Sequence, residues 1–302
     1  MQTAILKAAL AALLAFLPAV AFAGEAPVPP TRFSVTVEGE GPDLILIPGL
    51  TSSRRVWDRA VAGLGGRYRV HRLQIAGFGG EPAGPNGEEG PILDNVVAEL
   101  HAYIAANRLG RPLVAGHSVG GLIALMLAAR HPDDVARALI VDALPYYGLL
   151  LGPDSSPEGV ALAAATFRDA IEEATDANWR SHQSLVLASL VANEAARPAL
   201  LEDSVRSDRR VVARVLYEDA VTDMRPELPA MRTPLTIVYA VNPFATEARF
   251  GALMRSSYAG AADTRFVPVE PSFHFVMLDQ PGRFDAILAE FLAGAPDDGG
   301  QP

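Results

Sequence analysis

The sequence has no cysteine and fewer basic than acidic residues. Without cysteine among its 302 residues, the chain forms no disulfide, has no thiolate nucleophile and offers no cysteine for lipid attachment behind a cleaved leader. Its 25 Lys and Arg residues stand against 35 Asp and Glu residues, which gives a formal net charge of −10. Nucleic-acid binding needs a basic surface that neutralises phosphates, so this balance argues against a nucleic-acid partner.

The long apolar stretch of the chain lies at its beginning. Residues 1–23 combine a positive residue, Lys7, with an apolar run over 8–20 and a small-x-small ending at Ala21-Phe22-Ala23. This pattern predicts a signal peptide that is cleaved after Ala23. The apolar run is shorter than the roughly 20 residues that span a bilayer. We therefore expect an exported protein, periplasmic or secreted, with no membrane span after cleavage.

The remaining chain is predicted to form one domain over residues 33–294. Half of all residues are apolar, which is enough for a large core. A proline-rich leader over 24–32 precedes this domain, and a Gly/Asp-rich tail over 295–302 follows it.

Strand and helix patterns alternate along this domain. Short apolar runs predict strands, and longer segments of helical period predict helices between them. Several strands are apolar without interruption, which is typical of a mostly parallel sheet with helices on both faces. The predicted strands cover residues 33–37, 44–47, 69–75, 112–115, 138–141, 234–239 and 265–269, and the predicted helices cover 93–107, 119–130 and 283–292.

The alternation stops over residues 145–229. This segment is rich in alanine, has helical period and contains no clear strand. It is longer than an ordinary connection, so we expect a helical cap inserted between two strands, over the strand ends where open sheets bind ligands. Extra helices packed on one face of the sheet are the alternative.

A serine stands between glycines in the segment LVAGHSVGGL. Residues 116–120 match the pattern G-x-S-x-G, with a predicted strand before them and a predicted helix after them. That context indicates a sharp strand-to-helix turn with Ser118 at its top. A Cβ at Gly116 or Gly120 would crowd such a turn. At the start of the helix, free N–H groups favour a developing oxyanion near Ser118.

The chain resembles the capped, serine esterase-like hydrolases of the α/β-hydrolase superfamily. The similar segments are GHSVGG, LILIPGLTSSRRVWD, AGFGG and SFHFVMLDQP. The resemblance implies that Ser118 is the nucleophile and that His274, which follows the last predicted strand, is its base. It also implies that the backbone N–H groups of Leu50 and Val119 form the oxyanion hole. No cofactor is implied, and no pair of histidines has the sequence spacing of metal ligands.

The carboxylate that would orient His274 is less well defined by the sequence. Relatives of this type place an acid after the strand that follows the cap, where this chain has Asn242. Some place it one strand earlier, and this chain has Asp142 there. We take Asp142 as the predicted acid, with Asn242 and Glu247 as possible substitutes. Asp279, in the segment LDQP, is expected to cap the last helix.

The expected activity is hydrolysis of carboxylic esters through an acyl-enzyme on Ser118. The apolar, aromatic-bearing character of the 145–229 segment suggests an ester with a small or medium hydrophobic acyl or alcohol part as substrate. Thioesterase, lactonase and amidase activities use the same groups and stay open as alternatives, as does a non-catalytic binding protein that retained the fold. The natural substrate and the oligomeric state are not predicted.

Overall fold

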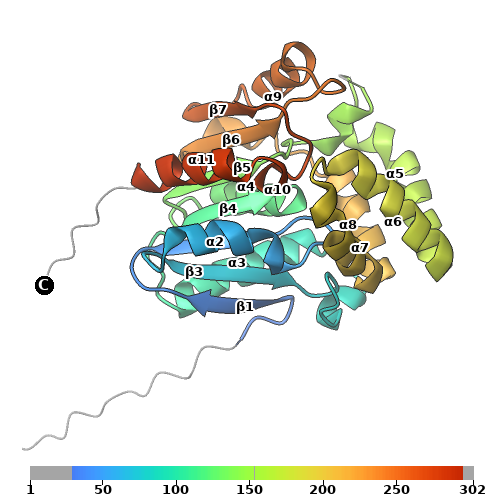
Figure 1. Ribbon diagram of the computed structural model, residues 1–302, viewed down its shortest axis with the longest axis horizontal. Helices are drawn as coiled ribbons and strands as arrows, with labels where there is room; N and C mark the ends of the chain where they lie inside the picture. Colours follow the sequence, from blue (N-terminus) through green and yellow to red (C-terminus); the bar gives the residue numbers. More distant parts are fainter. Residues whose placement is uncertain (1–28, 153, 295–302) are drawn as a thin grey trace, which may run out of the picture.

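The computed structural model describes residues 29–152 and 154–294 (Figure 1). The predicted signal peptide and tail, and most of the predicted leader, lie outside these residues. In the described part of the chain, no helix has the length and apolar character needed to cross a membrane.

A seven-stranded sheet forms the centre of the protein, in the order β1-β3-β2-β4-β5-β6-β7. Only β1 runs antiparallel to its neighbour, and the other strand pairs are parallel. This arrangement confirms the predicted fold class, and each predicted strand is present. The strands are β1 (Phe33–Glu38), β2 (Asp43–Ile47), β3 (Arg69–Ile75), β4 (Leu113–His117), β5 (Arg137–Val141), β6 (Leu235–Ala240) and β7 (Thr264–Val269).

The central strands are buried on both faces, as their uninterrupted apolar sequences predict. Along β2, Leu44 and Leu46 pack into one core, whereas Ile45 and Ile47 pack into the other. This division follows from the alternation of side chains along a strand. Helices cover each face: α3 (Leu93–Ala106) and α4 (Val119–Arg130) lie on one, and α2 (Asp58–Leu64) and α11 (Pro281–Ala293) lie on the other.

Helices also fill the segment between β5 and β6. They gather beside one end of the sheet in Figure 1. Three begin at side chains that accept a hydrogen bond from a free backbone N–H, namely Ser156, Thr175 and Asp208. The domain boundaries drawn from the sequence, including a cap over 145–229, stay a prediction. The helices are α5 (Pro157–Glu173), α6 (Asp176–Leu190), α7 (Arg197–Arg206) and α8 (Arg209–Val221), with short 3₁₀ turns at Tyr147–Leu150, Glu194–Ala196 and Leu228–Ala230.

The expected role of Asp279 in capping the last helix is wrong. Gln280 occupies the N-cap of α11 and makes no side-chain capping bond. The Asp279 carboxylate instead accepts hydrogen bonds from the backbone N–H groups of Asn193 and Phe273, both at 2.9 Å. It thereby ties the loop that carries His274 to the segment after α6.

Candidate active site

Ser118 stands on a strained turn between β4 and α4. Its backbone has φ 55° and ψ −127°, a conformation that residues other than glycine seldom adopt. The turn is held from both sides. The Ser118 N–H donates to the carbonyl of Val141 at 2.9 Å, and its carbonyl accepts from Gly121 at 2.7 Å. Such strain persists where the surrounding structure over-determines it, and it is concentrated at functional sites.

The glycines around Ser118 allow three backbone segments to meet. A Cβ on Gly116 would lie 2.0 Å from the carbonyl oxygen of Gly120, and a Cβ on Gly120 would lie 2.4 Å from that of Ile47. A Cβ on Gly49 would stand 3.0 Å from the Cβ of Ser118. The turn after β2, which carries Leu50, therefore lies directly against the serine.

The turn after β2 is fastened to α7. The hydroxyl groups of Thr51 and Ser204 lie 2.8 Å apart, within hydrogen-bond distance. The buried Asp203 carboxylate accepts hydrogen bonds from the N–H and hydroxyl groups of Ser53, at 3.3 and 2.5 Å. These contacts hold the backbone around Leu50 in place beside Ser118.

His274 is paired with Asp142. The Nδ1 atom of His274 lies 2.6 Å from Oδ2 of Asp142, while Oδ1 of the same carboxylate accepts from the N–H of Ala240 at 2.9 Å. The N–H of Asp142 donates to the carbonyl of Val238 at 2.7 Å. A carboxylate at Nδ1 places the ring proton there, so Nε2 is left with the lone pair that can accept a proton.

One cavity of about 610 Å³ joins these groups. Ser118, Asp142 and His274 follow β4, β5 and β7, so they meet at the carboxyl edge of the sheet. Leu50 and Val119 line the same cavity. The structure therefore brings together all five residues to which the sequence assigned the main roles.

The two alternative partners for His274 are engaged elsewhere. Asn242 donates from Nδ2 to the carbonyl of Ser272 and accepts from two N–H groups of its own turn, all at 3.0 Å. Glu247 accepts from the hydroxyl of Tyr239 at 3.1 Å and from Arg255 at 2.6 Å. Among the described residues, Asp142 is the carboxylate that bonds to the His274 ring.

His117 contacts His274, a feature that the sequence analysis missed. Its Nε2–H donates to the backbone carbonyl of His274 at 3.0 Å, and its ring lies 4.6 Å from the His274 ring and 4.7 Å from that of Phe275, between centroids. Burial, with a further contribution from His274, holds the pKa of His117 well below its ordinary value. The position of His117 next to Ser118 was the available sequence signal. It does not predict a hydrogen bond to the carbonyl of His274, which lies 157 residues away along the chain.

We expect His117 to make the protein less stable in mild acid. The unfolded chain protonates this ring below about pH 6.5, whereas the folded protein keeps it neutral. Folding stability is therefore lost as the pH falls through that value, by up to about 1.4 kcal/mol for each pH unit. In urea unfolding at a series of pH values, His117→Phe should lose less stability on acidification than the wild type. Equal losses in the two proteins would contradict this assignment.

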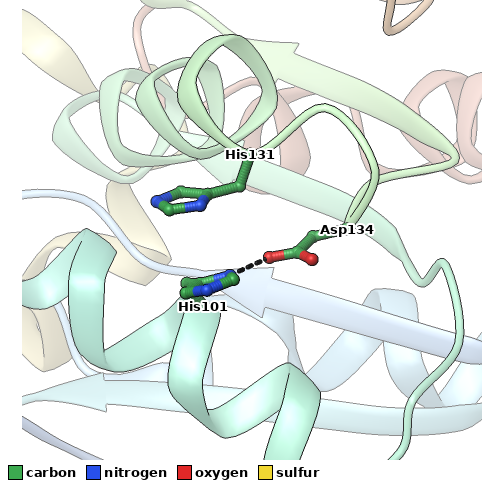
Figure 2. Close-up of side chains that lie close together, drawn as sticks. All are labelled: His101, His131 and Asp134. Atoms are coloured by element: carbon green, nitrogen blue, oxygen red, sulfur yellow. Dashed lines mark hydrogen bonds and ion pairs between the residues drawn. The ribbon is translucent and has the colours of Figure 1, made fainter.

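A second histidine cluster is shown in Figure 2, and none of its residues lines the cavity. His101 of α3, His131 at the end of α4 and Asp134 present ligand atoms within 4.8 Å of one another, although sequence spacing gave no hint of it. The two rings are stacked at 4.0 Å and 14°, and Nδ1 of His101 lies 2.5 Å from the Asp134 carboxylate. Nearly parallel rings do not direct their lone pairs at one point, so this geometry is that of two stacked rings, one of them within hydrogen-bond distance of Asp134, and we assign it no metal.

A serine, an aspartate and a histidine that follow the parallel strands β4, β5 and β7, in the chain order Ser–Asp–His, form the arrangement that defines the class of α/β hydrolases. A model of the alpha/beta hydrolase family matches residues 44–287, and the chain belongs to this family. The resemblance inferred from the motifs is thus confirmed.

Curated relatives and solved structures agree with this assignment. The chain is 28% identical over 273 residues to a pimeloyl-[acyl-carrier protein] methyl ester esterase of Aeromonas hydrophila, with 86% of this chain and 99% of the relative covered. It is 26% identical to an N-formylmaleamate deformylase of Pseudomonas putida, with 84% and 90% covered. The enol-lactonase of Burkholderia xenovorans LB400 shares the fold, with a TM-score of 0.71, 21% identity, and 87% and 97% covered.

Proposed function

We propose that the protein is a serine hydrolase that cleaves carboxylic esters. The observation that carries the proposal is the 2.6 Å pairing of His274 with Asp142 in the cavity that also contains Ser118. A serine hydroxyl is a weak nucleophile until a base accepts its proton, and a base fixed by a carboxylate supplies that function. Several curated relatives carry the name of a methyl ester esterase, which favours esters over other acyl compounds.

The proposed reaction begins when Oγ of Ser118 attacks the ester carbonyl and Nε2 of His274 accepts its proton. The N–H groups of Leu50 and Val119 stabilise the oxyanion of the tetrahedral intermediate. This intermediate collapses, the C–O bond to the alcohol breaks, and His274 returns the proton to the leaving oxygen. Water, deprotonated by His274, then attacks the acyl-enzyme, and the carboxylic acid leaves as Ser118 regains its proton. Asp142 stabilises the imidazolium in both halves of the reaction.

The cavity favours a small or medium hydrophobic ester. Apolar side chains from several elements line it, including Leu144, Leu150, Ile171, Val186 and Phe250. Its volume of about 610 Å³ is that of an ordinary small-molecule site. Thioesters, lactones and amides are open to the same attack and form the nearest alternative substrates.

A fluorophosphonate probe tests the proposal. We expect the native protein to gain one covalent adduct, located by peptide mass spectrometry at Ser118, while heat-unfolded protein gains none, because only the folded site activates the serine. Absence of labelling in the native protein would favour a non-catalytic binding protein instead.

We also propose export, on the basis of residues 1–23. The intact mass of protein isolated from its host tests this point, with a mature chain that begins at Gly24 as the expected result.

A further inference from the structure

Asp219 is a carboxylate of the cavity that the proposed reaction does not use. It lies near the end of α8 and lines the cavity that contains Ser118 and His274. Across residues 29–152 and 154–294, its carboxylate has no hydrogen bond and no ion pair, although most acidic side chains near it in sequence are paired. Glu218, its neighbour, accepts from the N–H groups of Ile92 and Leu93. Asp219 is thus a polar group without a structural partner.

The position of Asp219 on α8 directs it toward the substrate. Val212 and Leu216 precede it by seven and three residues, which places all three on one helical face, and all three line the cavity. Another part of the wall comes from α6, where Trp179, Gln183 and Val186 share a face by the same spacing. On the α8 face, the Asp219 carboxylate therefore follows two apolar residues that line the same cavity.

Keeping an unpaired carboxylate there costs stability. Burial raises the pKa of Asp219 to about 7, although the nearby His274 lowers it. An apolar residue at this position would avoid this cost. Orientation of His274 does not explain the carboxylate, because Asp142 is the residue that bonds to the His274 ring. Among the described residues that line the cavity, none is a lysine or arginine, so an anionic substrate group would meet Asp219 without a compensating cation.

We infer that Asp219 is a specificity-determining residue that accepts a hydrogen bond from a hydroxyl or ammonium group of the substrate. The inference rests on the proposed ester hydrolysis and narrows its substrate class. The favoured ester carries a hydrogen-bond donor on the part that extends from Ser118 toward α8. An ester with a carboxylate at the same place is rejected by like charge and by the loss of its hydration.

The selectivity for an ammonium ester depends on pH. An ionised Asp219 attracts the cation, and a protonated one does not, so the preference grows as the pH rises through the range where this carboxyl ionises. The titratable groups that face the cavity with Asp219 are His117, Asp142, Tyr147, His182 and His274. Because His274 governs the hydrolysis of every ester alike, the ratio of two rates cancels its effect, and a comparison with Asp219→Asn separates the contribution of Asp219 from that of the other titratable groups.

Four p-nitrophenyl esters of equal chain length test the inference: the hexanoate, the ω-hydroxyhexanoate, the ω-aminohexanoate and the adipate monoester. For the wild type we expect kcat/KM relative to the hexanoate to be higher for the hydroxy and amino esters, the latter by about tenfold or more. The adipate monoester should be the poorest substrate. In Asp219→Asn, the preference for the amino ester should fall by about tenfold and the adipate monoester should improve.

The control is Asp169→Asn, which removes one negative charge from the exposed surface of α5 and leaves the cavity lining unchanged. We expect it to match the wild type on all four esters. If Asp219→Asn hydrolyses the hexanoate and keeps the wild-type preferences among the four esters, the inference about Asp219 is overturned, whereas the proposed function stands. Absence of hydrolysis of every ester by the wild type would overturn the proposed function with it. If Asp219→Asn does not fold, the test uses the wild type, for which the ratio of kcat/KM for the amino ester to kcat/KM for the hexanoate is measured at several pH values. We expect this ratio to fall on acidification, and a constant ratio refutes the inference.

Discussion

Replacing Ser118 with alanine should lower the rate of p-nitrophenyl ester hydrolysis by about 10⁶-fold. The substitution removes the atom that forms the acyl-enzyme and leaves His274 with no partner to activate. The rate that remains should come from solvent attack on an ester held by the oxyanion hole. Steady-state kinetics of the purified variant gives this measurement directly.

The Ser118→Ala variant should also fold normally. Ser118 makes no side-chain capping bond to α4, and alanine meets the same backbone strain as serine at φ 55°. Circular dichroism and a melting temperature equal to that of the wild type would verify this. A folded variant with near wild-type activity would show that another residue is the nucleophile.

The second large effect is expected from Asp142→Asn, with a loss of about 10⁴-fold in kcat. The Oδ1 atom of the new amide keeps the hydrogen bond from the N–H of Ala240. Its NH₂ group then faces Nδ1 of His274 and donates to it, which moves the ring proton to Nε2. In that tautomer the ring cannot accept the proton of Ser118. The variant therefore keeps the position of the His274 ring, but the ring carries its proton on the wrong nitrogen.

Matched substitutions separate Asp142 from its two alternatives. Asn242→Ala and Glu247→Gln alter residues that hold their own turn and the Tyr239–Arg255 cluster, and they should each change kcat by less than about tenfold. If either one causes the large loss while Asp142→Asn does not, the acid of the site has been misassigned.

The sequence predicted the parts of the site that are local. Ser118 could be identified because the strand, the glycines and the helix that define its turn are contiguous. The strands could be identified because burial on both faces requires uninterrupted apolar runs. His274 came from resemblance to the family rather than from its own surroundings.

The partners of these residues were harder to predict because they lie far away along the chain. Asp142 and His274 are 132 residues apart, and three loops offered a polar group for the same ring. Which loop reaches it depends on the backbone: Asp142 adopts φ 49°, while Asn242 turns back on its own loop. The same reason explains the wrong expectation for Asp279, whose partners at Asn193 and Phe273 exist only in the folded protein.

The attachment of α7 to the turn after β2 limits how this enzyme can be re-engineered. The helices between β5 and β6 look like a module that could be exchanged between relatives to transplant substrate preference. Because Asp203 and Ser204 hold the backbone around Leu50, a graft that replaces all of α5–α8 would also release an N–H group proposed to bind the oxyanion. Chimeras should therefore exchange the cavity faces of α6 and α8 and retain α7, together with its bonds to Thr51 and Ser53.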